Sequence, residues 1–257
     1  MSRTAFVFAA LCGASVLGCA TEQAAPADDT QEIIDNLIQV GFPAADIKVF
    51  DGVVYTGFDA EVSLAASREM LQSPAGPEQY RTTNLVAATV RTICVNGAAF
   101  SGRFSQGLDM AIANYNALGL TFRMQRTTGS TTGCNATITA RLSTGTGGSS
   151  GFPTGGRPFN TINIGSGLST FDVNTVEHVI THELGHCVGF RHTDYFHRSI
   201  SCGGAATNEG NGGVGAILIA GTPSGATVGG SIMNSCFRQV ETGEFTASDI
   251  TALQALY

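Results

Sequence analysis

The stretch HELGHCVGFRH, from His182 to His192, places three histidines and a glutamate within eleven residues. The chain has five histidines among its 257 residues, and all of them lie between positions 178 and 197. Residues four apart on a helix share one face and are about 6 Å apart along the axis. His182 and His186 can therefore direct two imidazole nitrogens to one point, which is a geometry that binds a metal ion.

Gly189 and His192 complete the predicted metal site. The glycine permits a positive φ that ends the helix, after which His192 can approach the ion from another direction. Three neutral imidazoles leave one position of a tetrahedral zinc ion open, and zinc lowers the pKa of a bound water to about 7. Glu183 is rotated about 100° around the helix from His182, beside that water, and is the candidate general base. A structural zinc site is the alternative, although it would need a fourth protein ligand.

Four residues near the motif have more ordinary interpretations. His178 lies one turn before His182 and is expected to pack near the site without binding the ion, and His197 is expected to play no part. Cys187 points about 100° away from His186 and is expected to be a buried thiol or half of a disulfide. Asp194 either orients His192 by accepting its second ring hydrogen or caps the following turn.

Apolar periodicity predicts the elements around the motif. Helices are expected at residues 102–119, 172–189 and 245–257, the second capped by Asn174 and the third by a capping box of Thr246 and Asp249. Strands are expected at residues 84–95, 120–126, 134–142 and 159–165, the last as an exposed edge strand. Two glycine-rich tracts, residues 143–156 and 203–230, are interpreted as long loops. The order of these elements favours an α+β fold.

The residues before this region form a predicted acidic module, residues 19–78. Between positions 20 and 80 there are eleven acidic residues against Lys48 and Arg68, whereas residues 81–257 hold ten arginines and nine acids. The module is expected to contain a helix from Thr30, a hairpin at Asp51 and Gly52, and a second helix in residues 59–72. Turn residues at positions 73–77 predict a boundary before the second domain, residues 79–257. No basic tract with aromatic residues occurs, which disfavours nucleic acid as a partner.

Residues 1–18 carry one positive charge and a short apolar run, the pattern of an export signal. The following VLGC resembles a bacterial lipobox, so Cys19 would be lipidated and attach the protein to a membrane. Ordinary cleavage after GCA, giving a secreted protein, is the alternative. In both cases the mature chain is expected to act outside the cytoplasm.

Five cysteines belong to the mature body, and export makes disulfides plausible. Cys94 and Cys134 lie on segments expected to be neighbours in one sheet and are paired on that basis. Cys202 with Cys236 is the favoured second pair, leaving Cys187 single, although sequence alone does not fix the connectivity.

The motif fits the metzincin zinc-peptidase pattern H-E-x-x-H-x-x-G-x-x-H at every fixed position. Met233 in SIMNS matches the methionine turn of that clan, and HELGHCVGFRHTDYF most resembles the bacterial dual-action HEIGH metallopeptidases. The ending SDITALQALY is similar to the closing helix of matrixins. The resemblance covers about residues 81–257. It implies a metzincin-like fold with a twisted mixed sheet, an active-site helix and a C-terminal helix.

The same resemblance implies zinc-dependent endopeptidase activity on polypeptides and synthesis as a zymogen. It also implies that an extended substrate pairs with the edge strand expected at residues 159–164. No cysteine between positions 20 and 80 can serve as a matrixin-type switch, so latency would need another device.

The acidic module is the candidate for that device, because its negative charge could dock against a zinc cleft, with Asp51 or Asp59 reaching the metal. A solvated spacer that holds the enzyme away from a membrane is the alternative. For the whole protein, the rival hypothesis is a non-catalytic, zinc-stabilised surface lipoprotein that binds partners through its glycine-rich loops.

Overall fold

The computed structural model describes residues 29–39, 42, 44, 47–56, 59–71, 80–204, 208–210, 216–223 and 225–257. The elements, in chain order, are α1 (Asp29–Gln39), β1 (Lys48–Phe50), β2 (Val53–Thr56), β3 (Ala60–Glu61), α2 (Leu64–Leu71), β4 (Thr92–Asn96), α3 (Gly102–Ala117), β5 (Arg123–Thr127), β6 (Ala136–Ser143), β7 (Gly148–Gly151), β8 (Thr161–Gly165), the 3-10 helix η1 (Ser166–Thr170), α4 (Val173–Cys187), α5 (Ser199–Cys202) and α6 (Ala247–Leu256). The predicted export signal, Cys19 and the predicted boundary at positions 73–77 lie outside the described residues.

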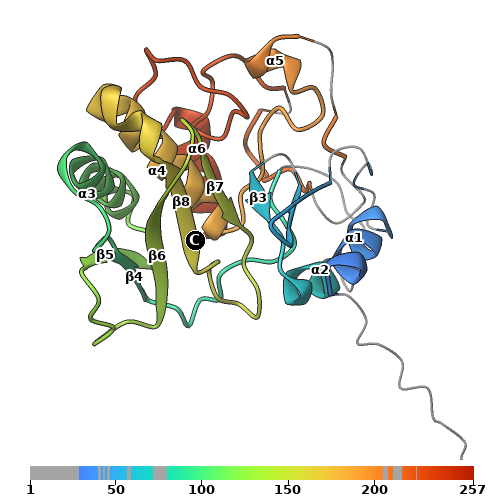
Figure 1. Ribbon diagram of the computed structural model, residues 1–257, viewed down its shortest axis with the longest axis horizontal. Coiled ribbons are helices and arrows are strands. Elements are labelled where there is room, and N and C mark those ends of the chain that lie inside the picture. Colours follow the sequence, from blue (N-terminus) through green and yellow to red (C-terminus); the bar gives the residue numbers. More distant parts are fainter. Residues whose placement is uncertain are drawn as a thin grey trace, which may run out of the picture.

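One mixed sheet runs through the molecule in the strand order β1-β2-β3-β7-β8-β6-β4-β5. Strands β8, β6, β4 and β5 are parallel, β7 is antiparallel to β8, and β3 is parallel to β7. The mixed α+β architecture expected from the sequence is confirmed, and the acidic module supplies the first three strands (Figure 1).

Helices α3 and α4 pack against each other and cover one face of the sheet (Figure 1). The predicted apolar stripe of α3 is buried: Phe104, Leu108, Ile112 and Tyr115. Gly107 lies against the backbone of Glu177 in α4, where a β-carbon would be tighter than ordinary packing allows. Alternate residues of β6 face the same core, since Ala136, Ile138 and Ala140 are buried while the residues between them are partly exposed. This core holds α4 rigidly against the sheet.

The acidic module has a small core of its own. Helices α1 and α2 pack side by side beside the β1–β2 hairpin, and Asp51 and Gly52 take the positive φ values of 49° and 79° that this turn requires. Its buried apolar residues are Ile33, Leu37, Phe42, Ile47, Val54, Ala60, Val62 and Ala66. Phe152, from the second part of the chain, inserts into the same cluster. The described residues of the acidic module thus combine helices and strands, and Phe152 joins their core to the rest of the protein.

The expected bounds of one strand and one helix are wrong. Residues 84–91 are not a strand, because their amides bond to loops: Ala87 N donates to Gly156 O at 2.8 Å. The predicted helix at residues 59–72 begins only at Leu64, because Ala60 and Glu61 pair with β7. Local propensity was overridden in both cases by partners distant in the sequence.

The first glycine-rich tract is not wholly a loop, because Gly148–Gly151 forms β7. This strand lies between β8 and β3, so the expected edge strand at residues 159–164 is also wrong: β8 is an interior strand. Within the second part of the chain, β7 is the outermost strand on that side, and β3 of the acidic module continues the sheet beyond it (Figure 1).

Both predicted disulfides are present. Cys94 and Cys134 are bonded, as are Cys202 and Cys236, and Cys187 is a buried free thiol. The predicted capping box of the last helix is confirmed, since Thr246 and Asp249 each bond the other's backbone amide.

Candidate metal centre

Helix α4 carries the first two predicted ligands, His182 and His186. Its N-cap is Asp172, whose carboxylate accepts from the amide of Asn174 at 2.9 Å, so the expected cap at Asn174 is wrong by two residues. The buried residues Val176, Ile180 and Leu184 fix the rotation of the helix.

Gly189 turns the chain toward the third histidine. It follows the C-cap residue Val188 and has a φ of 104°, a positive value as the spacing predicts. The Nε2 atoms of His182 and His186 are 3.1 Å apart, and those of His192 and His182 are 3.3 Å apart. The three predicted ligands therefore converge.

The Nδ1 atoms of the three histidines all face oxygen acceptors. That of His182 is 2.8 Å from the carbonyl of Ile232, and that of His186 is 2.7 Å from the carbonyl of Phe190. Carbonyl oxygens only accept, so these Nδ1 atoms carry the hydrogens and their Nε2 lone pairs face inward. The Nδ1 of His192 is likewise 2.8 Å from Oε1 of Glu209.

The inward lone pairs fit a zinc ion. Bonds of about 2.0–2.1 Å in a tetrahedron place neighbouring nitrogens about 3.3 Å apart, which agrees with the observed separations. Burial lowers the pKa of His186 to about 3, so this ring stays neutral and able to ligate. Burial also lowers the pKa of His192, but Asp59 and Glu209 outweigh burial and raise it to about 10. The two carboxylates thus stabilise positive charge at this point.

Asp59, from the acidic module, is the fourth member of the cluster. Its Oδ2 lies 3.1 Å from the Nε2 of His192 and 3.8 Å from that of His182, and its Oδ1 lies 3.6 Å from that of His186. One ligand atom from each of the four residues lies within 4.8 Å of the others. Burial alone would raise the pKa of Asp59, but the charge of His192 holds it well below its usual range.

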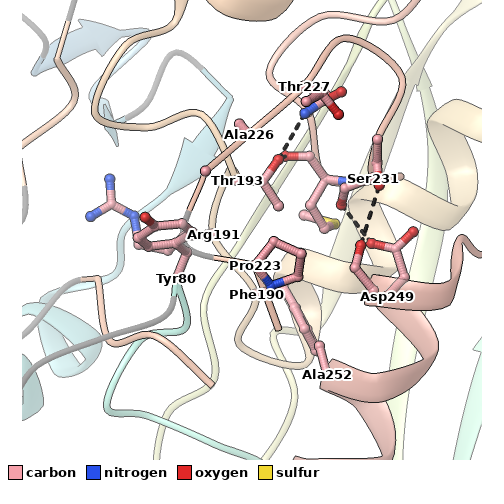
Figure 2. Close-up of a pocket in the computed structure, with 15 residues that line it drawn as sticks. Tyr80, Phe190, Arg191, Thr193, Pro223, Ala226, Thr227, Ser231, Asp249 and Ala252 are labelled. Carbon is pink, nitrogen blue, oxygen red and sulfur yellow. Dashed lines mark hydrogen bonds between the residues drawn. The ribbon is translucent and has the colours of Figure 1, made fainter. Parts of the chain in front are cut away.

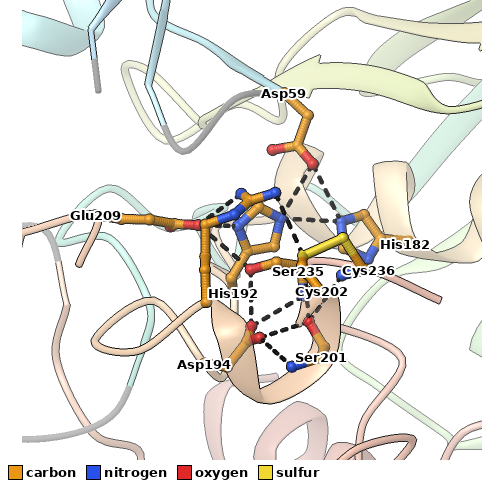
Figure 3. The surroundings of a disulfide bond; sticks show 10 residues. Asp59, His182, His192, Asp194, Ser201, Cys202, Glu209, Ser235 and Cys236 are labelled. Carbon is orange, nitrogen blue, oxygen red and sulfur yellow. Dashed lines mark hydrogen bonds and ion pairs between the residues drawn. A yellow bond between two sulfur atoms is a disulfide. The ribbon is translucent and has the colours of Figure 1, made fainter. Parts of the chain in front are cut away.

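Glu209 takes the role that the sequence suggested for Asp194. Its carboxylate bonds the Nδ1 of His192, and both side chains are only 1% exposed. Figure 3 shows Glu209 and Asp59 on different sides of the His192 ring. Arg191 and Arg198 contact the same carboxylate at 3.3 and 2.9 Å. Burial would raise the pKa of Glu209, but the charge and hydrogen bond of His192, together with the charge of Arg191, lower it to about 2.

Asp194 follows the other alternative, which was the capping of the next turn. Its Oδ2 accepts from the amide and hydroxyl of Ser201 in α5, and its Oδ1 accepts from the amide and hydroxyl of Ser235 (Figure 3). The neighbouring disulfide joins Cys202 to Cys236. Asp194 therefore ties the segment after His192 to the methionine turn and does not orient the ring.

Glu183 lies in the same buried region but outside the ligand cluster. Its Oε2 is buried without a hydrogen-bond partner among the described residues. Burial raises its pKa well above the ordinary value, and the charge of Asp59 raises it further. The carboxylate lies against Gly148 of β7, where a β-carbon would overlap it. A carboxyl with a raised pKa beside a metal site holds a proton more firmly than an ordinary carboxylate and can act as an acid as well as a base.

Met233 lies against Gly185 of α4 and directly follows Ile232, whose carbonyl accepts from His182. It is buried, and any side chain at Gly185 would overlap its sulfur. Asp249 of α6 accepts from the Ser231 hydroxyl at 2.5 Å (Figure 2). It also accepts from the Ile232 amide at 3.0 Å, so it anchors residues 231–233. A cavity of about 80 Å³ lies beside this turn, between Thr193 and α6 (Figure 2).

The remaining histidines and the free cysteine stay outside the cluster. The Nδ1 of His178 is 2.8 Å from the carbonyl of Thr242, and that of His197 is 2.9 Å from the hydroxyl of Ser199. Cys187 is buried, and burial raises the pKa of its thiol, so it is a core residue.

Sequence comparison matches one family model, described as dual-action HEIGH metallo-peptidase, over residues 54–257. The matched region begins within β2 and so includes Asp59. No curated protein sequence matches the chain.

Three solved structures are similar at low identity. A crystal structure of myroilysin is 12% identical with a TM-score of 0.38, covering 72% of this chain and 88% of that chain. Another structure of myroilysin is 14% identical with a TM-score of 0.42, covering 66% and 93%. High choriolytic enzyme 1, a hatching enzyme zinc-protease from the medaka fish Oryzias latipes, is 16% identical with a TM-score of 0.40, covering 70% and 94%.

Proposed function

Since this chain belongs to the family of dual-action HEIGH metallopeptidases, we propose that His182, His186 and His192 hold its catalytic zinc ion and that Glu183 is the general base. The chain is a zinc metalloendopeptidase, and its substrates are polypeptides. The observation that carries the proposed site is the convergence of three Nε2 atoms whose Nδ1 atoms are each fixed by an oxygen behind them.

A bound zinc ion supplies Lewis-acid activation of a water molecule and of the scissile carbonyl. Glu183 accepts the proton of the attacking water and returns it to the amine nitrogen as the peptide C–N bond breaks. Its raised pKa suits both steps, because a carboxyl of ordinary pKa would hold the proton too weakly to deliver it. The unpartnered Oε2 is free to make that hydrogen bond.

Replacing Glu183 by Gln tests the role of base. The amide keeps the size of the side chain but cannot take up a proton, so we expect kcat to fall by about 10²–10⁴-fold while bound zinc stays near one equivalent. Peptide cleavage and elemental analysis of the same sample measure both quantities.

Glu177→Gln is the matched control, because Glu177 lies on the same helix and bonds Asn114 at 2.8 Å, a contact that glutamine can keep. It should leave kcat within about twofold. Full cleavage by the Glu183→Gln protein would remove Glu183 from the mechanism. Zinc binding without any cleavage, both by the native chain and by a chain in which the acidic module no longer contacts the zinc site, would instead favour the non-catalytic surface lipoprotein.

We further propose export, with residues 1–18 as the signal and either a lipidated Cys19 or a free secreted form. The two disulfides support this proposal, since such bonds persist in oxidising compartments. Among the described residues no helix is both long enough and apolar enough to cross a bilayer. Labelling cells with a radioactive fatty acid separates the two forms: label on the native chain but not on Cys19→Ser indicates the lipoprotein, and unlabelled protein in the medium indicates secretion.

A further inference from the structure

The acidic module reaches the metal centre through β3 and the residue before it. Ala60 pairs with Ser150 and Glu61 with Gly151 in a parallel ladder, and the Ser150 amide donates to the carbonyl of Asp59 at 3.0 Å. This ladder fills the edge of β7, which would otherwise be the outermost strand beside Glu183. An unpaired strand edge is where an extended peptide adds to a sheet.

The Asp59 carboxylate faces the open corner of the histidine cluster. It stands 3.1–3.8 Å from the three Nε2 atoms, within reach of any ion that they hold. Catalytic zinc sites keep one position for water, whereas sites with four protein ligands are closed. The group placed there is a side-chain carboxylate and not a peptide bond, so the segment blocks the corner without offering a scissile carbonyl.

Two further contacts hold the module in this position. The guanidinium of the buried Arg191 stacks over the Phe42 ring of the module at 4.6 Å. Phe152, directly after β7, is buried within the core of the module. A solvated spacer would require none of these contacts, so they favour the other interpretation of the module.

We propose that the acidic module keeps the enzyme latent through two linked contacts: Asp59 occupies the fourth position at the zinc ion, and β3 occupies the strand edge where substrate binds. This inference rests on the proposed peptidase function. Activation is the removal of both contacts together, because Asp59 directly precedes β3. The proposal also places the substrate-binding strand edge at β7, whereas the sequence predicted it at residues 159–164.

Asp59→Asn in the full chain tests the metal contact, with mass spectrometry to verify that the chain stays intact. An amide oxygen is a weaker zinc ligand than a carboxylate, so the fourth position should open. We expect acetohydroxamate to bind the zinc-loaded variant roughly 100-fold more tightly than the native chain, and cleavage of a quenched fluorescent peptide to rise by about the same factor. The absorption spectrum of the cobalt(II)-substituted protein should change as the ligand set changes.

Asp51→Asn is the control, since it removes the same charge at the hairpin turn, where asparagine tolerates the positive φ. The Asp51→Asn protein should match the native chain in hydroxamate affinity, in peptide cleavage and in the cobalt(II) spectrum. The inference is overturned if the Asp59→Asn protein has the same hydroxamate affinity and cleavage rate as the native chain. It is also overturned if cleavage by Asp59→Asn falls, because Asp59 would then be a zinc ligand that the active enzyme needs. Stronger hydroxamate binding without any cleavage would support the latent contact and refute the peptidase function.

Gly151→Ala tests the strand contact without touching a ligand. A β-carbon at Gly151 would overlap the carbonyl oxygen of Glu61 most closely and would also meet the ring of Phe159, so β3 should dock less well. We expect hydroxamate affinity to rise about tenfold, because loosening β3 also loosens Asp59. Gly147→Ala is the control, since a β-carbon there meets no atom within 4 Å. Equal hydroxamate affinity in both variants would contradict the linkage between strand and ligand.

Discussion

The three histidines differ in what holds each ring from behind. His182 and His186 each bond a backbone carbonyl, whereas His192 bonds the Glu209 carboxylate. A carboxylate raises the basicity of a ligating imidazole more than a neutral carbonyl does, and it fixes the tautomer. The orientation and basicity of the His192 ring should therefore depend on one side chain, that of Glu209, whereas those of His182 and His186 depend on the backbone.

Glu209→Gln should weaken zinc binding by about 10–100-fold while the protein remains folded. The amide oxygen can still accept from the His192 ring, but the negative charge that faces His192, Arg191 and Arg198 is lost. Competition with a chromophoric chelator measures the affinity, and circular dichroism checks the fold. Glu244→Gln, an exposed charge on another loop, is the control. Unchanged zinc affinity would mean that the backbone alone positions His192.

At this scale the sequence predicts the residues whose spacing is local and misses those brought in from a distance. Helical periodicity and one glycine are enough to place His182, His186 and His192 together. Glu209 lies in a glycine-rich tract without periodicity, so no pattern connects it to His192. One signal was available, since Glu209 is the only acidic residue between positions 195 and 240.

Strand β7 is the element on which both proposals depend. Its sequence, GSSG, has a glycine at each end for different reasons. Gly148 leaves room for the Glu183 carboxylate, and Gly151 leaves room for the carbonyl of Glu61. The small residues thus let the general base and an added strand approach the same backbone.

Gly148→Ala should lower kcat/KM by about 10²-fold without changing zinc affinity. The new methyl group would overlap the Glu183 carboxylate and displace it from the position where it takes a proton. The Gly148→Ala change is made both in the native chain and in the Asp59→Asn chain. In the second chain, the proposed latent contact is absent and cannot hide a loss of kcat/KM. Gly147→Ala, one residue earlier and in open space, should cleave as its parent does. If Gly148→Ala cleaved equally well, Glu183 would have to act from another position.

The elements with strong periodicity could be predicted, and those made by pairing could not. The stripe of α3, the site helix α4 and the capping box of α6 follow from their own sequences. Strands β3 and β7 are two and four residues long and rich in small or charged residues, so neither has a pattern of its own. Strand β7 pairs with β8 and β3, and β3 pairs with β2 and β7, so both strands are defined by their pairing partners and not by a pattern of their own.

On the scale of the whole molecule, two hydrophobic cores are joined at one sheet and one metal site. The larger core lies under α3 and α4, and the smaller lies within the acidic module. The four residues of the metal cluster come from both parts, since Asp59 belongs to the module and the histidines to the rest. A bound ion should therefore stabilise both the second domain and its contact with the module.

Removing zinc with a chelator should lower the midpoint of thermal unfolding by about 10 °C. An ion present at about 1,000 times its Kd contributes roughly 4 kcal/mol, and each kcal/mol is worth about 2–4 °C for a chain of this size. The loss should also expose the module to limited proteolysis, because Asp59 then has no ion to bind. Calorimetry and gel analysis measure the two effects, and added zinc should reverse both. His197→Ala, outside the cluster, should respond to the chelator as the native chain does. An unfolding midpoint that is the same with and without chelator would show that the ion does not link the two cores.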